Sequence, residues 1–174
     1  MTDIKMTSVN FKNLKEFVFN SFIAMGLNKI DAEIFSDALM FSELRFHSGQ
    51  GQGVQRITTY YKRIKNKEIN VNSDYEIIKE SSSLALVDAK NGIGTVQASK
   101  CMEIAINKAK KEGIGKVIIK NSTHFGSSSV HAVKASSENC IGVVYTNAGP
   151  EMAPWGSKSG EIGRASCRER VSTS

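Results

Sequence analysis

The residues best suited to chemistry lie between a β-branched run and a run of small residues. His124 sits in residues 121–126 (Asn-Ser-Thr-His-Phe-Gly), after Val117–Ile119 and before Gly126–Ser129. The apolar run predicts a parallel strand buried on both faces, and the small residues predict a helix start whose N–H groups suit a phosphate or carboxylate. Open α/β sheets bind ligands at the carboxyl ends of their strands. We interpret this loop as a candidate reaction centre, with a satisfied, partly buried histidine as the alternative.

The elements that must position this loop have an α/β pattern. Strands are predicted at 75–78 and 84–87, with a turn at Asn91-Gly92 and a helix from about Thr95 to Glu112. Strand 116–120, a helix over 128–137 and strand 141–146 then predict a βαβ unit. The loop 147–156 after the last strand holds both prolines and Trp155, the single tryptophan. This loop is either a ligand wall beside His124 or a cover over the core.

The first third of the chain is predicted to be helical. One helix has its apolar positions at helical spacing and ends before Gly26, and a second is capped by Asn28. The predicted core residues of these two helices are Phe11, Leu14, Val18, Phe22 and Met25, then Ile30, Ile34, Ala38 and Phe41. A third helix is predicted over 54–64, after a glycine-rich loop at 45–53 that contains His47.

Composition restricts the class of protein. The 174 residues are 40% hydrophobic and 23% charged, which suits one ordinary globular core. No apolar run is long enough to span a bilayer and the N-terminus lacks a signal-peptide pattern, so a cytoplasmic protein with no membrane partner is expected. The net charge of +6 comes from dispersed lysines and predicts a solvated basic surface with no nucleic-acid partner. The three cysteines have no metal-ligand spacing, so reduced thiols and no metal site are predicted.

Residues 161–174 differ in composition from the rest. Arginine is sparse before Gly160, whereas Arg164, Arg168 and Arg170 follow closely upon one another. The run 161–171 also looks like an in-frame translation of a common sequencing adaptor. We therefore predict an N-terminal helical segment at 1–70, an incomplete α/β domain at 71–160 and a non-native tail at 161–174. An ordinary exposed basic terminus is the alternative for the tail.

The motifs together carry a family resemblance. They are Leu-Arg-Phe-His at 44–47, Gly-Val-Gln-Arg at 53–56, Asn-Ser-Thr-His-Phe-Gly at 121–126, Gly-Val-Val-Tyr-Thr-Asn at 142–147 and Ala-Pro-Trp-Gly at 153–156. In this order and spacing the chain resembles the malate/L-lactate/ureidoglycolate dehydrogenases, the type 2 lactate dehydrogenases whose fold is not a Rossmann fold. The resemblance covers nearly all of residues 10–160. Because family members are roughly twice as long, the chain resembles their N-terminal half.

The resemblance implies a set of site residues. His124 matches the histidine that accepts a proton or lies against the nicotinamide, and the stretch His124, Phe125, Gly126, Ser127 and Ser128 matches a cofactor-contacting one. Asn147 and Ala148 match another cofactor contact. Arg56 matches a substrate-binding arginine, a role that suits a guanidinium because it binds a carboxylate through two hydrogen bonds.

The chain departs from the family at one catalytic position. Many members have Ser-His-Gly where this chain has Gly-Gln-Gly at 51–53, so the serine and histidine used there for proton transfer are absent. Gln52 is assigned to substrate binding beside Arg56. His47, in a loop with an apparent two-residue insertion, is assigned as a catalytic replacement, and a histidine without function is the alternative.

The resemblance also implies the chemistry. It is hydride transfer to or from NAD or NADP. The other partner is the hydroxyl-bearing carbon of a small 2-hydroxy acid of malate, lactate or ureidoglycolate type, or the imine carbon of a cyclic imine. An imidazole can accept and return the hydroxyl proton near neutral pH. A homodimer is implied at full length. The alternative is an inactive fragment or interaction module of dehydrogenase ancestry.

Overall fold

Local capping signals define the helices of the first unit, Met1–Asn72. Of the whole chain, this computed structural model describes residues 8–45, 53–147, 155–156, 158–159 and 166–167. Helix α1 (Phe11–Ala24) begins at Asn10, whose side-chain oxygen accepts hydrogen bonds from two first-turn N–H groups. Gly26 follows the helix with a φ of +97°, so the predicted glycine stop is confirmed.

The next two helices complete this unit. Helix α2 (Lys29–Leu44) begins at Asn28, whose side chain accepts from the N–H of Asp31 at 2.9 Å, as predicted. After it come the 3-10 helix η2 (Val54–Arg56) and helix α3 (Ile57–Lys65), which together match the predicted third helix. The core joins all three α-helices, because the Phe35 ring stacks on Phe22 at 4.3 Å and meets Tyr60 edge-on at 4.6 Å.

The predicted core face of α2 is only partly right. Ala38 is buried as predicted, but Ile30 is 71% exposed, and Ile34 and Phe41 are only half-buried. The buried stripe is displaced around the helix and consists of Ala32, Phe35, Ser36, Leu39 and Ser42. Both sets have helical spacing, and the packing of Phe35 against Phe22 decides which set is buried. Periodicity alone did not distinguish them.

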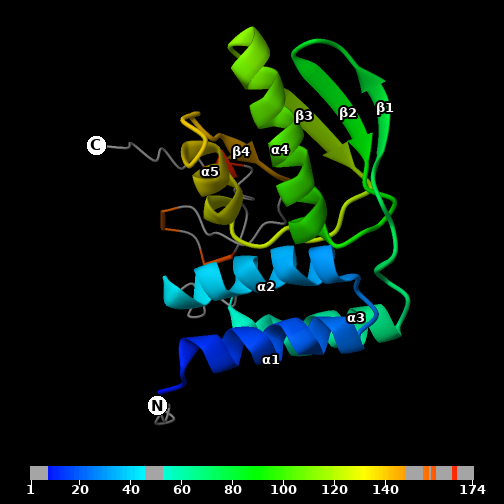
Figure 1. Cartoon of the computed structure of the whole chain (residues 1–174), viewed down its shortest axis with the longest axis vertical. Helices are drawn as coiled ribbons and strands as arrows, with labels where there is room; N and C mark the ends of the chain where they lie inside the picture. Colours follow the sequence, from blue (N-terminus) through cyan, green and yellow to red (C-terminus); the bar gives the residue numbers. More distant parts are fainter. Residues whose placement is uncertain (1–7, 46–52, 148–154, 157, 160–165, 168–174) are drawn as a thin grey trace. The chain divides into compact units, whose positions relative to one another are not determined.

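The second unit, Ser73–Ser174, contains a small mixed sheet. Its strands are β1 (Glu76–Glu80), β2 (Leu84–Asp88) and β3 (Lys116–Lys120), in the order β1-β2-β3. β1 and β2 form an antiparallel pair, and β2 and β3 a parallel one. Helix α4 (Gly94–Glu112) connects β2 to β3 and lies across one face of the sheet (Figure 1). Gly113 ends it with a φ of +79°, as predicted.

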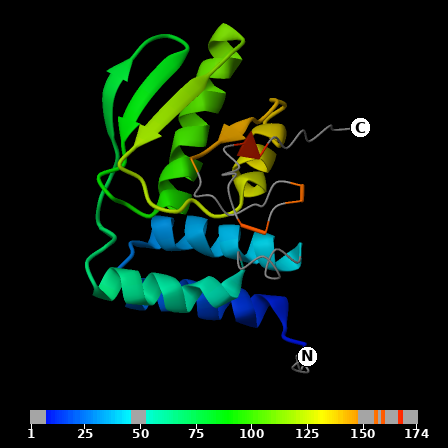
Figure 2. The ribbon, with the colours of Figure 1, turned by 180° about the vertical axis from the view of Figure 1, so that it is seen from behind.

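Among the described residues of the second unit, only one face of the sheet is covered. On the α4 side, Ala85, Val87 and Cys101 form a buried cluster that Val117 and Ile119 also contact. On the other side Leu84 is 50% exposed and Ile118 is 52% exposed. Figure 2 shows this second face, over which no helix of the second unit lies within the described ranges. The prediction that 117–119 is buried on both faces is therefore wrong for this chain, because α4 covers one face and the described residues provide no second layer.

The predicted βαβ unit also joins the wrong pair of strands. The parallel unit is β2-α4-β3. After β3, helix α5 (Ser128–Ser136) agrees with the sequence, but β4 (Val144–Tyr145) is two residues long and pairs with β5 (Ser166–Cys167) in a separate sheet. Backbone packing brings the start of the β4 segment onto α5, since a Cβ at Gly142 would lie 2.5 Å from the carbonyl oxygen of Ala132.

β5 belongs to the segment expected to lie outside the fold. Its antiparallel pairing joins Val144 to Cys167 and Tyr145 to Ser166. An unpaired strand edge can hydrogen-bond to an extended segment through its backbone, whatever that segment's side chains are. This pairing is therefore compatible with either interpretation of residues 161–174, and the non-native origin of the tail stays a prediction.

Deletion of residues 161–174 is expected to change stability little. Two residue pairs at an edge contribute about 1 kcal/mol or less to the free energy of unfolding. The measurement is a melting curve of both lengths, with and without saturating NAD(H) or NADP(H). If dinucleotide raises a cooperative transition of the 174-residue chain and the deletion abolishes that transition, the tail is genuine structure.

Candidate functional site

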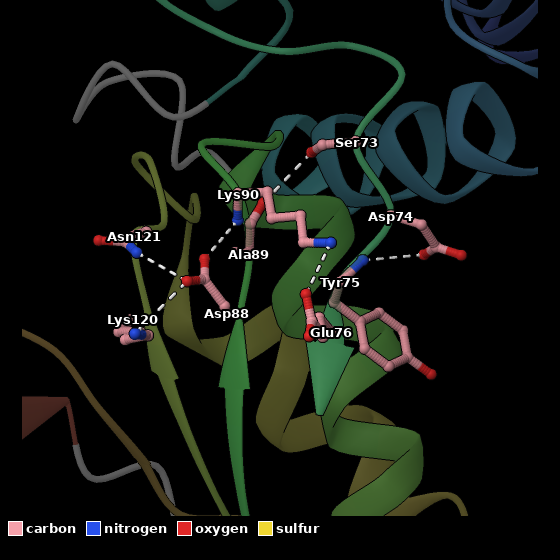
Figure 3. Close-up of polar contacts among 9 residues, drawn as sticks. All are labelled: Ser73, Asp74, Tyr75, Glu76, Asp88, Ala89, Lys90, Lys120 and Asn121. Atoms are coloured by element: carbon pink, nitrogen blue, oxygen red, sulfur yellow. Dashed lines mark hydrogen bonds and ion pairs between the residues drawn. The ribbon is translucent and has the colours of Figure 1, made fainter. Parts of the chain in front are cut away.

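Polar contacts at the carboxyl ends of β2 and β3 fix the start of the His124 loop (Figure 3). Asp88 ends β2 and accepts hydrogen bonds from the N–H of Lys90 at 2.8 Å and from the side-chain amide of Asn121 at 2.9 Å. Together with Lys120, these donors hold the pKa of the Asp88 carboxyl below its ordinary value. Asn121 has a φ of +50°, and its carbonyl oxygen accepts from the N–H of Asn91 at 2.8 Å. The loop therefore leaves the sheet in a defined direction.

Thr123 ties the loop to the first turn of α4. Its hydroxyl accepts from the N–H of Gly94 at 2.9 Å and donates to the carbonyl of Gly92 at 2.9 Å. It therefore caps α4, whose own N-cap residue Ile93 makes no side-chain cap bond. A Cβ at Gly94 would lie 2.1 Å from the carbonyl oxygen of Thr123, so only glycine permits this approach.

His124 is exposed, and its ring is oriented by the backbone that follows it. The N–H of Gly126 donates to His124 Nδ1 at 3.2 Å. Gly126 has a φ of +82°, and a Cβ there would lie 3.1 Å from Thr95 Oγ1. That hydroxyl oxygen is buried and has no hydrogen-bond partner among the described residues. The loop thus presents an accessible imidazole, and an unsatisfied buried hydroxyl group lies beside its Gly126.

A second histidine supports this loop from α5. His131 is 1% exposed, its Nε2 lies 2.9 Å from the carbonyl oxygen of Phe125, and its ring stacks on the Phe125 ring at 5.3 Å. Its Nδ1 lies 3.4 Å from Ser99 Oγ on α4. Burial lowers the pKa of His131 despite the opposing bond to Phe125. His131 is therefore a neutral core residue at neutral pH.

The start of α5 lies directly after the loop. Ser127 is its N-cap residue and makes no side-chain cap bond; its hydroxyl lies 2.7 Å from that of Ser129. Ser128 and Ser129 are buried. First-turn N–H groups and serine hydroxyls can donate to an anion, so this end of the helix fits a phosphate or carboxylate.

The other predicted residues lie elsewhere or outside the described part. Arg56 belongs to the first unit, where η2 is held by the N–H of Val54 donating to the Glu43 carboxylate at 2.9 Å, and its side chain is half-buried. Asn147 follows β4 and is exposed. The remaining three predicted site residues, His47, Gln52 and Ala148, lie outside the described residues. Trp155 is fully exposed, so the alternative in which it covers the core is wrong, and the ligand wall stays a prediction.

The sequence predictions missed the residues that support the loop. They are Gly94, Ser99, Thr123 and His131. His131 could have been noticed as one of only three histidines, seven residues after His124 on the following helix. Thr123 lies in the 121–126 motif, but its capping role was not predicted, and nothing local marked Gly94 and Ser99, because the partners are about 30 residues away in the chain.

Other kinds of site have less support. Among the described residues no group of three or more His, Cys, Asp or Glu side chains could hold a metal ion. None of the helices in these ranges is both long and apolar enough to cross a membrane. Cys101 is buried, which raises the pKa of its thiol to about 12 and makes it a poor nucleophile.

Comparison with known proteins gives this fold and loop a context. The structure is similar to that of malate dehydrogenase from Pyrococcus horikoshii OT3, with a TM-score of 0.84 and 34% identity over 94% of this chain and 46% of that one. The sequence is 38% identical to a malate dehydrogenase of Pyrococcus abyssi (82% of this chain, 39% of that protein). It is 34% identical to an L-sulfolactate dehydrogenase of Methanocaldococcus jannaschii (87% and 44%).

These relatives are dehydrogenases, and this chain has the same class of fold. A family model described as malate/L-lactate dehydrogenase matches residues 9–167. The chain therefore belongs to the malate/L-lactate dehydrogenase family, which confirms the resemblance drawn from the motifs. The chain spans less than half the length of these relatives.

Proposed function

We propose that a family-length protein containing this chain is an NAD- or NADP-dependent oxidoreductase acting on a small 2-hydroxy acid of malate, lactate or ureidoglycolate type, or on a cyclic imine. The observation that carries the proposal is the exposed His124, oriented by Gly126 and followed at once by the start of α5. An oriented imidazole beside an anion-binding helix end can serve both a substrate oxygen and a charged ligand. The family membership supports the same conclusion.

The residues around the loop fit a dinucleotide. The uncapped start of α5 at Ser127 and Ser128 offers donors to its phosphates, and Thr95 Oγ1 leaves a buried hydroxyl group to be satisfied. Phe125 and Gly126 complete the loop contact, and Asn147 and Ala148 are proposed to add a second one. The nicotinamide, when bound, supplies the hydride chemistry.

The protein's part is to position the substrate and to serve its oxygen. His124 is proposed to hydrogen-bond the substrate oxygen and to handle its proton, with His47 as a second proposed proton carrier. Arg56 and Gln52 are proposed to bind the substrate carboxylate. A guanidinium suits this task because it stays charged and forms two parallel bonds.

Replacing Arg56 with lysine in a family-length protein is expected to raise KM about 10-fold or more and to lower kcat less. Lysine keeps the charge but loses the fork that grips both carboxylate oxygens. The measurement is steady-state kinetics over a panel of 2-hydroxy and 2-oxo acids. Arg63→Lys is the matched control, because Arg63 lies on α3 and pairs with Glu68 at 3.3 Å. An unchanged KM for every acid would make Arg56 a structural residue.

A second candidate is an inactive fragment, and the apolar face around Leu84 and Ile118 favours it. A single assay separates the two: turnover of NAD(P)H with the acid panel by the 174-residue chain and by a version extended to family length. The oxidoreductase proposal expects activity in the longer protein, and failure of both to turn over any acid or imine would contradict it. We also propose a cytoplasmic homodimer for the longer protein, which sedimentation and cell fractionation would test.

A further inference from the structure

One peptide group in the loop is held at both ends by a histidine. The carbonyl oxygen of Phe125 lies 2.9 Å from His131 Nε2. The N–H of the same peptide group, that of Gly126, donates to His124 Nδ1 at 3.2 Å. The buried histidine and the exposed one are therefore connected through a single planar unit.

The partners determine which nitrogen of His131 carries the proton. A carbonyl oxygen can only accept, so Nε2 must be the donor. In the neutral ring Nδ1 is then an acceptor, and Ser99 Oγ at 3.4 Å is placed to donate to it. The ring is buried, and burial favours this neutral form.

The same reasoning applies to His124. Because the Gly126 N–H is a donor, Nδ1 must be unprotonated to accept from it. In the neutral ring the proton is then on Nε2. A proton on Nδ1 would face the Gly126 N–H and break this bond, so the loop conformation selects the tautomer with Nε2–H.

His131 strengthens that selection. A hydrogen bond to the Phe125 carbonyl polarises the peptide group and makes its N–H a better donor. The Phe125 ring stacks on His131 at 5.3 Å, and His131 Nδ1 lies 3.4 Å from Ser99 Oγ on α4, so we expect the peptide plane to be restrained from rotating. Rotation of that plane would turn the Gly126 N–H away from His124.

We propose that His131 is a positioning residue that sets, through the Phe125–Gly126 peptide group, the orientation and tautomer of His124, so that neutral His124 meets its ligand as an Nε2–H donor. For its catalytic meaning the inference rests on the proposed function. There the donor points to the carbonyl oxygen of a 2-oxo acid, a role that a neutral imidazole can fill by polarising that bond.

The test uses the full 174-residue chain, without substrate or cofactor, at about pH 8, where a histidine of ordinary pKa is neutral. Nitrogen-15 NMR of labelled imidazoles reports which ring nitrogen carries the proton. We expect Nε2–H at both His131 and His124, and an amide of Gly126 protected from hydrogen exchange. A proton on Nδ1 of His131 would overturn the proposal directly.

Variants separate positioning from simple packing. His131→Phe keeps a ring against Phe125 but removes the donor, and is expected to speed exchange of the Gly126 amide about 10-fold and to mix the His124 tautomers. His131→Gln offers an amide N–H and is expected to restore both signals. Ser99→Ala removes the donor to His131 Nδ1 but leaves the bond to Phe125 intact, and is expected to change both signals less than His131→Phe does. A folded His131→Phe variant with unchanged Gly126 exchange and His124 tautomer contradicts the proposal.

If His131→Phe does not fold, the wild-type tautomers and the His131→Gln variant still test the proposed role of His131. The two proposals also fail separately. No dinucleotide enters this NMR experiment, so an inactive family-length protein with Nε2–H at both rings contradicts only the proposed function. An active enzyme whose His131 carries its proton on Nδ1 contradicts only the role of His131.

Discussion

Replacing His124 with alanine in a family-length protein is expected to lower kcat by about 10²- to 10⁴-fold, the usual cost of losing the group that serves the reacting oxygen. The expectation rests on an exposed imidazole that the Gly126 N–H already orients. Because the side chain at 124 points out of the fold, its removal should leave the melting temperature nearly unchanged. The measurement is kcat and kcat/KM across a pH series.

A neighbouring variant is the control for this loss. Ser122 is exposed and its hydroxyl contacts only the next residue's carbonyl, Thr123 O, at 3.4 Å among the bonds of the described residues. Ser122→Ala is therefore expected to keep full activity. Near-normal kcat in the His124 variant at every pH would show that another group serves the substrate oxygen, with His47 as the first to test.

Replacing Gly94 with alanine is expected to lower the free energy of unfolding by about 1 to 3 kcal/mol, the cost of overpacking a closed site. The new Cβ would lie 2.1 Å from the Thr123 carbonyl oxygen and 2.6 Å from that of His124, both of them backbone atoms. Alanine's better helix propensity offsets only up to about 1 kcal/mol of this cost. The melting temperature should fall by several degrees.

The same change should also reach the candidate site. Thr123 and His124 must move away from α4, so the NMR signals of His124 and Gly126 are expected to shift and dinucleotide binding by a family-length protein to weaken. Gly113→Ala at the other end of α4 is the control. Apart from its own chain neighbours, no atom of the described residues lies within 4 Å of its Cβ position, so its cost comes from a φ of +79° and should leave the loop signals unchanged. Equal effects of the two substitutions on the loop would contradict the close packing at Gly94.

The local elements of the fold could be predicted from the sequence. The cap at Asn28, the glycine stops at Gly26 and Gly113, and strand 116–120 are where the patterns predicted them. Each depends on hydrogen bonds or dihedral preferences within a few residues. The family was predictable for a related reason, because short motifs keep their order and spacing along the chain.

Pairing and burial could not be predicted in the same way. The sequence predicted the segments around β3 and β4 but paired them wrongly, and three of the four positions it assigned to the buried face of α2 are not buried. In both cases several arrangements satisfy the local periodicity equally well. Contacts between segments far apart, such as the ring of Phe35 on that of Phe22, decide among them.

The same distinction between local and long-range features applies to the candidate site. The sequence by itself determined that His124 follows a strand and precedes a helix, and hence that an imidazole stands at the edge where open α/β sheets bind ligands. Only the tertiary structure decided how that imidazole is held. It brought α4 against the loop through Gly94 and Thr123, and placed His131 on the Phe125 carbonyl. Those bonds exist because folding brings α4, α5 and the loop within hydrogen-bond distance of one another, about 3 Å. The spacing of residues along the sequence does not specify such distances.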